Sequence, residues 1–163
     1  MEMQARTGRS RDDAVLLGHL GPDLLGGWTA TEQQAAVTGL LRDPTRVLGE
    51  ALLDQPVVAG MGTIWVAEAC FVHGANPLAP VGAAKAPARL LQRTRQMMRA
   101  SLVHGRPLTT GDRRQPLWVY GRHRQPCLRC GTTLRAGRIG PPTRERTTYW
   151  CPLCQPLPTE QDG

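Results

Sequence analysis

The stretch CLRCGTTLRAGRIGPPTRERTTYWCPLC, from Cys127 to Cys154, decides the fold of the C-terminal part of this 163-residue chain. It holds two C-x2-C pairs, Cys127/Cys130 and Cys151/Cys154, which are separated by 20 residues. The two-residue spacing lets one tight turn aim both thiolates of a pair at a single ion, and two such turns complete a tetrahedron around Zn²⁺. We therefore predict one structural Zn²⁺ on these four cysteines, with no open coordination position.

Two alternatives for the four cysteines are a pair of disulfides and a redox-active C-x-x-C motif. The first residues contain no apolar segment of a secretory signal, and no apolar run approaches the roughly 20 residues of a membrane-spanning helix. We therefore expect a cytoplasmic protein without membrane contact, and disulfides are rare in that compartment. A redox motif would need a thioredoxin-like βαβ context, which the sequence lacks. The fifth cysteine, Cys70, lies in an apolar stretch and is expected in the core.

Positive charge is concentrated in residues 89–146. The chain has 20 Lys and Arg against 13 Asp and Glu, and 19 of those 20 bases are arginine. Residues 89–146 hold 14 arginines and two acids, a net charge of +12, whereas residues 1–88 carry −3 and residues 147–163 carry −2. A block of one sign repels itself unless an anion offsets it, and the guanidinium pairs bidentately with phosphate. We expect a nucleic acid as the anion; the alternative is a solvated basic face.

The sequence upstream of the cysteines predicts a mainly helical domain. Thr29 and Glu32 fit a capping box, and Gly74 and Gly105 are placed to end later helices. Asp43 followed by Pro44 indicates a cap and the first position of another helix. The expected helices cover about 30–41, 44–52, 63–73 and 87–104. Short strand candidates at 117–120 and 147–151 follow, so we expect a small β-hairpin zinc finger after the helices.

Four stretches of this sequence resemble the Fpg/Nei family of formamidopyrimidine-DNA glycosylases and endonuclease VIII enzymes. LLDQPVVAGMGTIWVAEACFVHGANPLAP (52–80) resembles the family's helix–two-turn–helix, and HLGPDLL (19–25) resembles the connector that enters it. LWVYGRHRQPCLRCGTTL (117–134) and RERTTYWCPLCQ (144–155) resemble its C-terminal zinc finger. The similarity covers about residues 15–155 in the family's order and is strongest to the actinobacterial Nei-like branch.

The resemblance implies a division of the chain. Residues 19–112 would form the helix–two-turn–helix DNA-binding domain and residues 113–156 the zinc finger. We expect residues 1–18 to be a tail or a remnant of an N-terminal domain, and residues 157–163 to be a disordered tail. The family's N-terminal β-sandwich domain would be missing.

The resemblance also implies a clamp on double-stranded DNA that carries a lesion or an abasic site. Gly60 and Gly62 would let backbone N–H groups approach a phosphate at the start of the helix that begins at Thr63. Arg146 matches the family's finger arginine. The family usually has Asn where this chain has Thr63, so we expect a weaker phosphate contact there. DNA binding would associate the protein with the nucleoid.

The family's chemistry uses an N-terminal proline followed by a glutamate, and this chain begins Met1-Glu2-Met3. No catalytic residue is therefore assigned, and whether the chain is an enzyme stays open. Three functions are considered: a DNA-binding protein without catalysis of its own, an active DNA glycosylase/AP lyase completed by an upstream or separate N-terminal half, and a zinc-ribbon adaptor for RNA or protein. Glu68 matches a family acid and is expected to be a structural, hydrogen-bonded carboxylate. Gln55 is left without a role.

Overall fold

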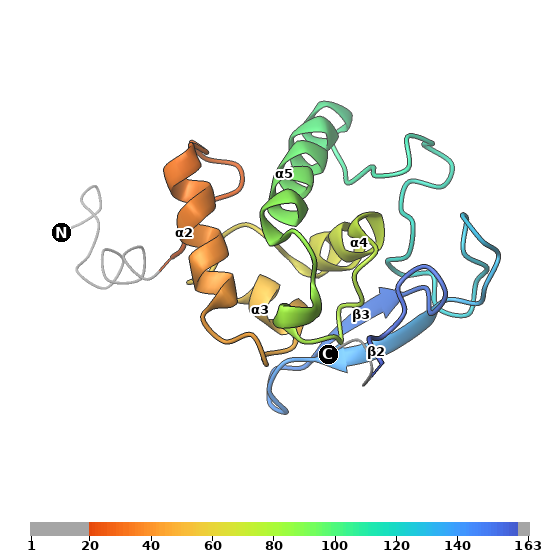
Figure 1. Cartoon of the computed structure of the whole chain (residues 1–163). Coiled ribbons are helices and arrows are strands. Elements are labelled where there is room, and N and C mark those ends of the chain that lie inside the picture. Colours follow the sequence, from red (N-terminus) through yellow and green to blue (C-terminus); the bar gives the residue numbers. More distant parts are fainter. Residues whose placement is uncertain (1–19, 160–163) are drawn as a thin grey trace.

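The computed structural model describes residues 20–159, so His19 and the predicted tail 1–18 lie outside the described residues, as do residues 160–163. Within residues 20–159 the chain forms helices first and a single two-stranded hairpin last (Figure 1). This order confirms the predicted mainly helical fold followed by a small β-hairpin. The elements are α2 (Ala30–Leu41), α3 (Leu48–Leu53), α4 (Thr63–His73), the 3₁₀ turn η1 (Val81–Ala83), α5 (Pro87–His104), β2 (Arg135–Ile139) and β3 (Arg146–Trp150).

Local sequence signals explain the ends of three helices. The Thr29 hydroxyl accepts the backbone N–H of Thr31, and the Glu32 carboxylate accepts the N–H of Thr29 at 3.3 Å, so the predicted capping box opens α2. Helix α4 ends at Gly74 with φ 76° and α5 at Gly105 with φ 71°, both in the left-handed region. These boundaries agree with the sequence predictions.

The start of α3 was predicted four residues too early. The Asp43 carboxylate accepts the backbone N–H of Thr45 at 3.1 Å and its hydroxyl at 2.6 Å. This side chain therefore closes a turn on its own backbone instead of capping a helix. Helix α3 begins only at Leu48.

The hairpin differs from the prediction in one strand. Strand β3 confirms the candidate at 147–151 and pairs antiparallel with β2, with Arg135 opposite Trp150. The candidate at 117–120 is wrong, because the backbone N–H groups of residues 118–120 donate to a side chain of α4. Gly137 explains why β2 was missed: a Cβ there would lie 3.0 Å from the Trp150 ring, so a weak strand former is needed at this position.

Helix α4 is the central element of the fold. It lies between α5 on one side and the hairpin on the other (Figure 1), and all residues from Val66 to Phe71 are buried. One apolar cluster joins α4 to the other helices and includes Leu40, Leu52 and Leu91. A second cluster joins Ala67 and Phe71 of α4 to the finger. The finger thus shares its core with α4, while the boundary at residue 112 stays a prediction.

No helix within residues 20–159 has the length and apolar character needed to cross a membrane.

Candidate functional site

A cleft of about 800 Å³ separates the α3–α4 side of the molecule from the tip of the hairpin. Gly62 and Thr63 line one side, and Arg144 and Arg146 line the other. The structure thus brings three of the residues singled out from sequence, Gly62, Thr63 and Arg146, to one cleft. Gly60 does not line this cleft.

The N-terminus of α4 opens into this cleft with unsatisfied donors. The first intrahelical bond runs from the N–H of Val66 to the carbonyl of Gly62 at 3.0 Å. No side chain caps the helix, and among the described residues the N–H groups of Thr63, Ile64 and Trp65 have no acceptor. Free N–H groups and the helix dipole together favour an anion at this position.

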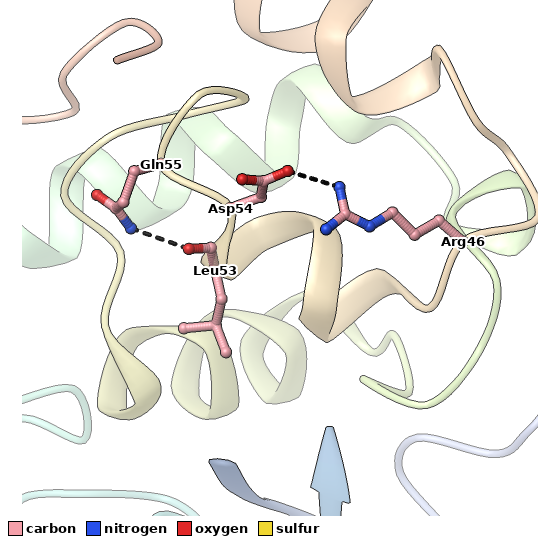
Figure 2. Close-up of polar contacts among 4 residues, drawn as sticks. All are labelled: Arg46, Leu53, Asp54 and Gln55. Carbon is pink, nitrogen blue, oxygen red and sulfur yellow. Dashed lines mark hydrogen bonds and ion pairs between the residues drawn. The ribbon is translucent and has the colours of Figure 1, made fainter. Parts of the chain in front are cut away.

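Gln55 holds the turn that leads into α4. Its amide nitrogen donates to the carbonyl of Leu53 at 3.0 Å (Figure 2) and to that of Met61 at 3.3 Å, and its amide oxygen accepts the N–H of Gly60 at 3.0 Å. Gly60 has φ 106°, a conformation that favours glycine. The N–H of Gly60 is therefore bound within the protein, and Gly60 shapes the turn. Gln55 is a residue whose role the sequence did not reveal.

The connector 20–25 braces the other face of the same turn. The N–H of Gly21 donates to the carbonyl of Gln55 at 2.8 Å, and Leu24 and Ala59 are joined by a backbone bond of 3.0 Å. A Cβ on Gly21 would lie 2.5 Å from the carbonyl oxygen of Val57, so the close approach requires glycine. The turn is thus held from the connector and from Gln55.

An ion pair reduces the positive charge on the α3 side of the cleft. The Arg46 Nη1 atom lies 2.8 Å from Oδ2 of Asp54, and each side chain is about one-third exposed (Figure 2). It is the only ion pair among residues 20–159, so Arg144 and Arg146 have no acidic partner there. Glu50 of α3 also lines the cleft and has no ion-pair partner among these residues, so the uncompensated positive charge of the cleft is on the hairpin side.

Tyr120 places a further hydroxyl beside the start of α4. Its phenolic oxygen lies 3.5 Å from the Thr63 hydroxyl, and its ring packs edge-on against Tyr149 of β3 with centroids 5.1 Å apart. Sequence reasoning missed Tyr120, because its proximity to Thr63 depends on how the finger docks on α4.

Glu68 provides that docking. Its carboxylate is fully buried and accepts the N–H groups of Trp118 at 2.7 Å, Val119 at 2.9 Å and Tyr120 at 3.0 Å, as well as the Thr109 hydroxyl. These hydrogen bonds anchor Thr109 and residues 118–120, which lead into the finger, on helix α4. The prediction of a structural carboxylate is confirmed.

The four predicted cysteines form one cluster. All sulfur atoms lie within 4.8 Å of one another, with Cys127 and Cys154 at 4.0 Å and Cys130 and Cys151 at 3.5 Å. A tetrahedral site with metal–sulfur bonds of about 2.3 Å has edges of about 3.8 Å, so this set of donors fits one metal ion. The N–H of Arg129 points to the Cys127 sulfur at 3.4 Å, as expected of such a turn.

Burial and hydrogen bonding shift the pKa values of three of these thiols in different directions. Desolvation raises the pKa of Cys154 to about 12 and also raises that of Cys151, whereas hydrogen bonds with Thr132 lower the pKa of Cys130 to about 6. A bound cation offsets the thiolate charge and releases the protons. Burial alone raises the pKa of Cys70 to about 12, and this fully buried thiol is a core residue as predicted.

Comparisons with known proteins show the family to which this chain belongs. No family model matches the chain. It is 48% identical over 146 residues to the DNA-(apurinic or apyrimidinic site) lyase Nei2 of Mycolicibacterium smegmatis, with 88% of this chain and 55% of that protein covered. It is 46% identical over 158 residues to the probable endonuclease 8 2 of Streptomyces coelicolor, with 95% and 56% covered. The chain belongs to the Fpg/Nei family. The similarity to its actinobacterial Nei-like branch is confirmed.

Solved Fpg structures have the same fold. The MutM (Fpg) protein of Thermus thermophilus is 29% identical, with a TM-score of 0.70 over 91% of this chain and 58% of that one. A Lactococcus lactis Fpg complex with abasic-site DNA has a TM-score of 0.69 at 23% identity, over 91% and 57%. The chain spans about half the length of the Fpg/Nei relatives it matches.

Part of the arginine block of this Fpg/Nei chain serves the fold. Arg95 donates to the carbonyls of Leu24 at 2.6 Å and Gly26 at 2.9 Å. Arg122 is buried and donates to the carbonyls of Trp118 at 2.8 Å and Pro126 at 2.9 Å. The net charge of residues 89–146 therefore overstates the charge available to a ligand.

Gln155 is another structural residue that sequence reasoning missed. It is fully buried next to the second cysteine pair, where its side chain accepts the N–H of Cys151 at 2.8 Å and donates to the carbonyl of Ala75 at 2.8 Å. The Asn76 side-chain amide donates to the backbone carbonyl of Gln155 at 2.8 Å. The finger is thus attached to the loop after α4 as well as to Glu68.

Proposed function

We propose that residues 20–159 bind double-stranded DNA that carries a lesion or an abasic site, as the DNA-gripping half of an Fpg/Nei-type glycosylase/AP lyase in base excision repair. The observation that carries this proposal is the cleft in which the open N-terminus of α4 faces Arg146. One side offers neutral N–H donors and the other a guanidinium. Phosphate oxygens of a nucleic acid accept hydrogen bonds from both kinds of donor.

The contacts follow from this arrangement. A phosphate at the N-terminus of α4 accepts N–H groups of Gly62 and Thr63, with the Thr63 and Tyr120 hydroxyls as further donors. Arg146 pairs with a second phosphate from the hairpin. Gly60 acts through the shape of the turn. DNA binding of this kind would associate the protein with the nucleoid.

The metal ion is proposed to be a single Zn²⁺ held by Cys127, Cys130, Cys151 and Cys154. Four thiolates with tetrahedral spacing are the donor set of structural zinc sites, which leave no position for a substrate. Its contribution is to hold the hairpin that presents Arg146.

The described residues are proposed to bind the DNA but not to catalyse the glycosylase/AP lyase reaction. Glu68 has its carboxylate fully engaged, and the Cys70 thiol is buried and stays protonated at neutral pH. These two groups are therefore unsuited to act as base or nucleophile. The alternative, an active glycosylase/AP lyase, requires a catalytic half supplied from an upstream or separate segment. A zinc-ribbon adaptor for RNA or protein is the third candidate.

Electrophoretic mobility shift with three duplexes tests the proposal. The probes are one sequence with an abasic site, the same sequence intact, and the matching RNA duplex. We expect tightest binding to the abasic-site DNA, and equal binding to all three would favour the adaptor. Borohydride reduction of the same mixtures tests for an imine. Efficient covalent trapping by residues 1–163 would show that the chain carries the reaction as well.

A further inference from the structure

Arg129 touches both the metal site and the core of α4. It lies between two proposed metal ligands, and its backbone N–H points to the Cys127 sulfur at 3.4 Å. Its guanidinium carbon lies 4.6 Å from the centroid of the Phe71 ring and 5.3 Å from that of Trp118. Both distances are within the range of a cation–π contact. One residue therefore joins a ligand sulfur to two aromatic rings.

The two rings belong to the segments that fix the finger on the helix. Phe71 is fully buried in the last turns of α4, and Trp118 stacks on it with centroids 5.3 Å apart. The backbone N–H of Trp118 donates to Glu68 of the same helix. The Arg129 guanidinium thus covers the contact between α4 and the segment that enters the finger.

We propose that Arg129 is a positioning residue that transmits the state of the metal site to the docking of the finger on α4. When both cysteine pairs are held together, the backbone of Arg129 is fixed and its guanidinium stays on the rings of Phe71 and Trp118. Residues 118–120 then remain on Glu68, so that Tyr120 stays beside Thr63 and the hairpin stays aligned across the cleft. The step to DNA binding rests on the proposed function.

Backbone hydrogen exchange tests the coupling without DNA. The reporters are the amides of residues 118–120, which donate to Glu68, and the variants are Arg129→Leu and Arg129→Lys. In the zinc-loaded protein we expect Arg129→Leu to accelerate exchange of these amides about two- to fivefold, the factor of an exposed cation–π contact, and Arg129→Lys to restore most of the protection. Unchanged exchange in Arg129→Leu would overturn the proposal.

Removal of the metal then separates coupling from a local packing role. With a chelator, exchange of the 118–120 amides should rise in the wild-type protein and rise by a smaller factor in Arg129→Leu, because part of the connection is already lost. An equal chelator effect in both proteins would mean that Arg129 only packs, and the proposal would fail. Zinc content, measured for each protein before chelation, ensures that the comparison starts from loaded sites.

DNA affinity provides the second readout, with Arg138→Leu as the matched control. Arg138 lies exposed on β2, does not line the cleft, and its loss removes the same charge. We expect Arg129→Leu to weaken abasic-site binding more than Arg138→Leu at the same salt concentration. Equal weakening would mean that Arg129 contributes only its positive charge to DNA binding, and would overturn its positioning role. If the wild-type protein binds no DNA, the proposed function fails, while the exchange experiment still decides on Arg129.

Discussion

The amide oxygen of Gln55 accepts the backbone N–H of Gly60 at 3.0 Å, and this bond ties the end of α3 to the turn that precedes α4. The same side chain donates to the carbonyls of Leu53 and Met61. The position of the first N–H groups of α4 in the cleft therefore depends on one half-buried amide.

The first prediction concerns Gln55→Leu. The substitution removes three hydrogen bonds of a partly exposed turn, so we expect a loss of about 1–2 kcal/mol in the free energy of unfolding. The loss in DNA affinity should be about tenfold, or about 1.4 kcal/mol, because donors fixed to a phosphate position tolerate little displacement. Urea denaturation and mobility shift measure the two effects. Gln34→Leu on α2 is the control, and equal DNA affinity of the two variants would refute the role of Gln55.

The second prediction concerns Glu68→Gln. The two carboxylate oxygens accept three backbone N–H groups and one hydroxyl, whereas an amide offers one oxygen and turns an NH₂ group toward the remaining donors. We expect a loss of about 2–4 kcal/mol in stability. Thr109→Val, which removes the hydroxyl that contacts Glu68 and, at 3.2 Å, the carbonyl of Pro116, should lose about 1 kcal/mol. Denaturant titration checks both values, and a Glu68→Gln protein as stable as Thr109→Val would contradict this account.

Features encoded within a few residues could be predicted from the sequence. The capping box at Thr29, the glycine that ends α4 and the spacing of the cysteines depend on neighbouring residues, and the structure agrees with each. Asp43 shows the limit of such signals, because the same residue type caps a helix or closes a turn. The two outcomes differ only in the backbone that follows, which the surrounding packing decides.

The residues that were missed act across long sequence separations. Gln155 bonds residues about 80 positions earlier, and Tyr120 meets Thr63 across 57 positions. Strand β2 contains a glycine because the Trp150 ring lies over it, which only the pairing reveals. Glu68 was recognised as structural from its apolar helix, but its backbone partners at 118–120 were not, since that segment was expected to be a strand.

The third prediction concerns the five thiols. Burial raises the pKa of Cys70 to about 12, so this thiol stays protonated in the folded protein at pH 8. Loss of the metal should open the finger and expose its four cysteines, so after chelation iodoacetamide at pH 8 should modify these four thiols, whereas Cys70 in the core should react only after the whole protein unfolds. The Cys70 contribution to stability is present below its ordinary pKa of 9.0 and is lost as the pH rises toward 12. Mass spectrometry counts the modified thiols, and rapid labelling of Cys70 in the folded protein would disprove the assignment.

The fourth prediction concerns Thr63. The Thr63 hydroxyl lies at the first turn of α4 beside Tyr120, and an asparagine there would add an amide donor that reaches further into the cleft. We expect Thr63→Asn to strengthen abasic-site binding about two- to fivefold and Thr63→Val to weaken it by a similar factor, the value of a hydrogen bond of about 0.5–1 kcal/mol. Titration at fixed salt measures both. Identical affinities for the two variants would exclude Thr63 from the contact.

The fifth prediction concerns Arg146, which stands at the start of β3 on the hairpin side of the cleft without an acidic partner among residues 20–159. If it neutralises one phosphate, its removal releases one counterion fewer on binding. Arg146→Ala should therefore weaken binding and reduce the slope of log K against log salt concentration by about one. Arg138→Ala on the neighbouring strand should change the slope less, because Arg138 does not line the cleft. A series of titrations between low and physiological salt distinguishes the two, and parallel lines for wild type and Arg146→Ala would remove Arg146 from the phosphate contact.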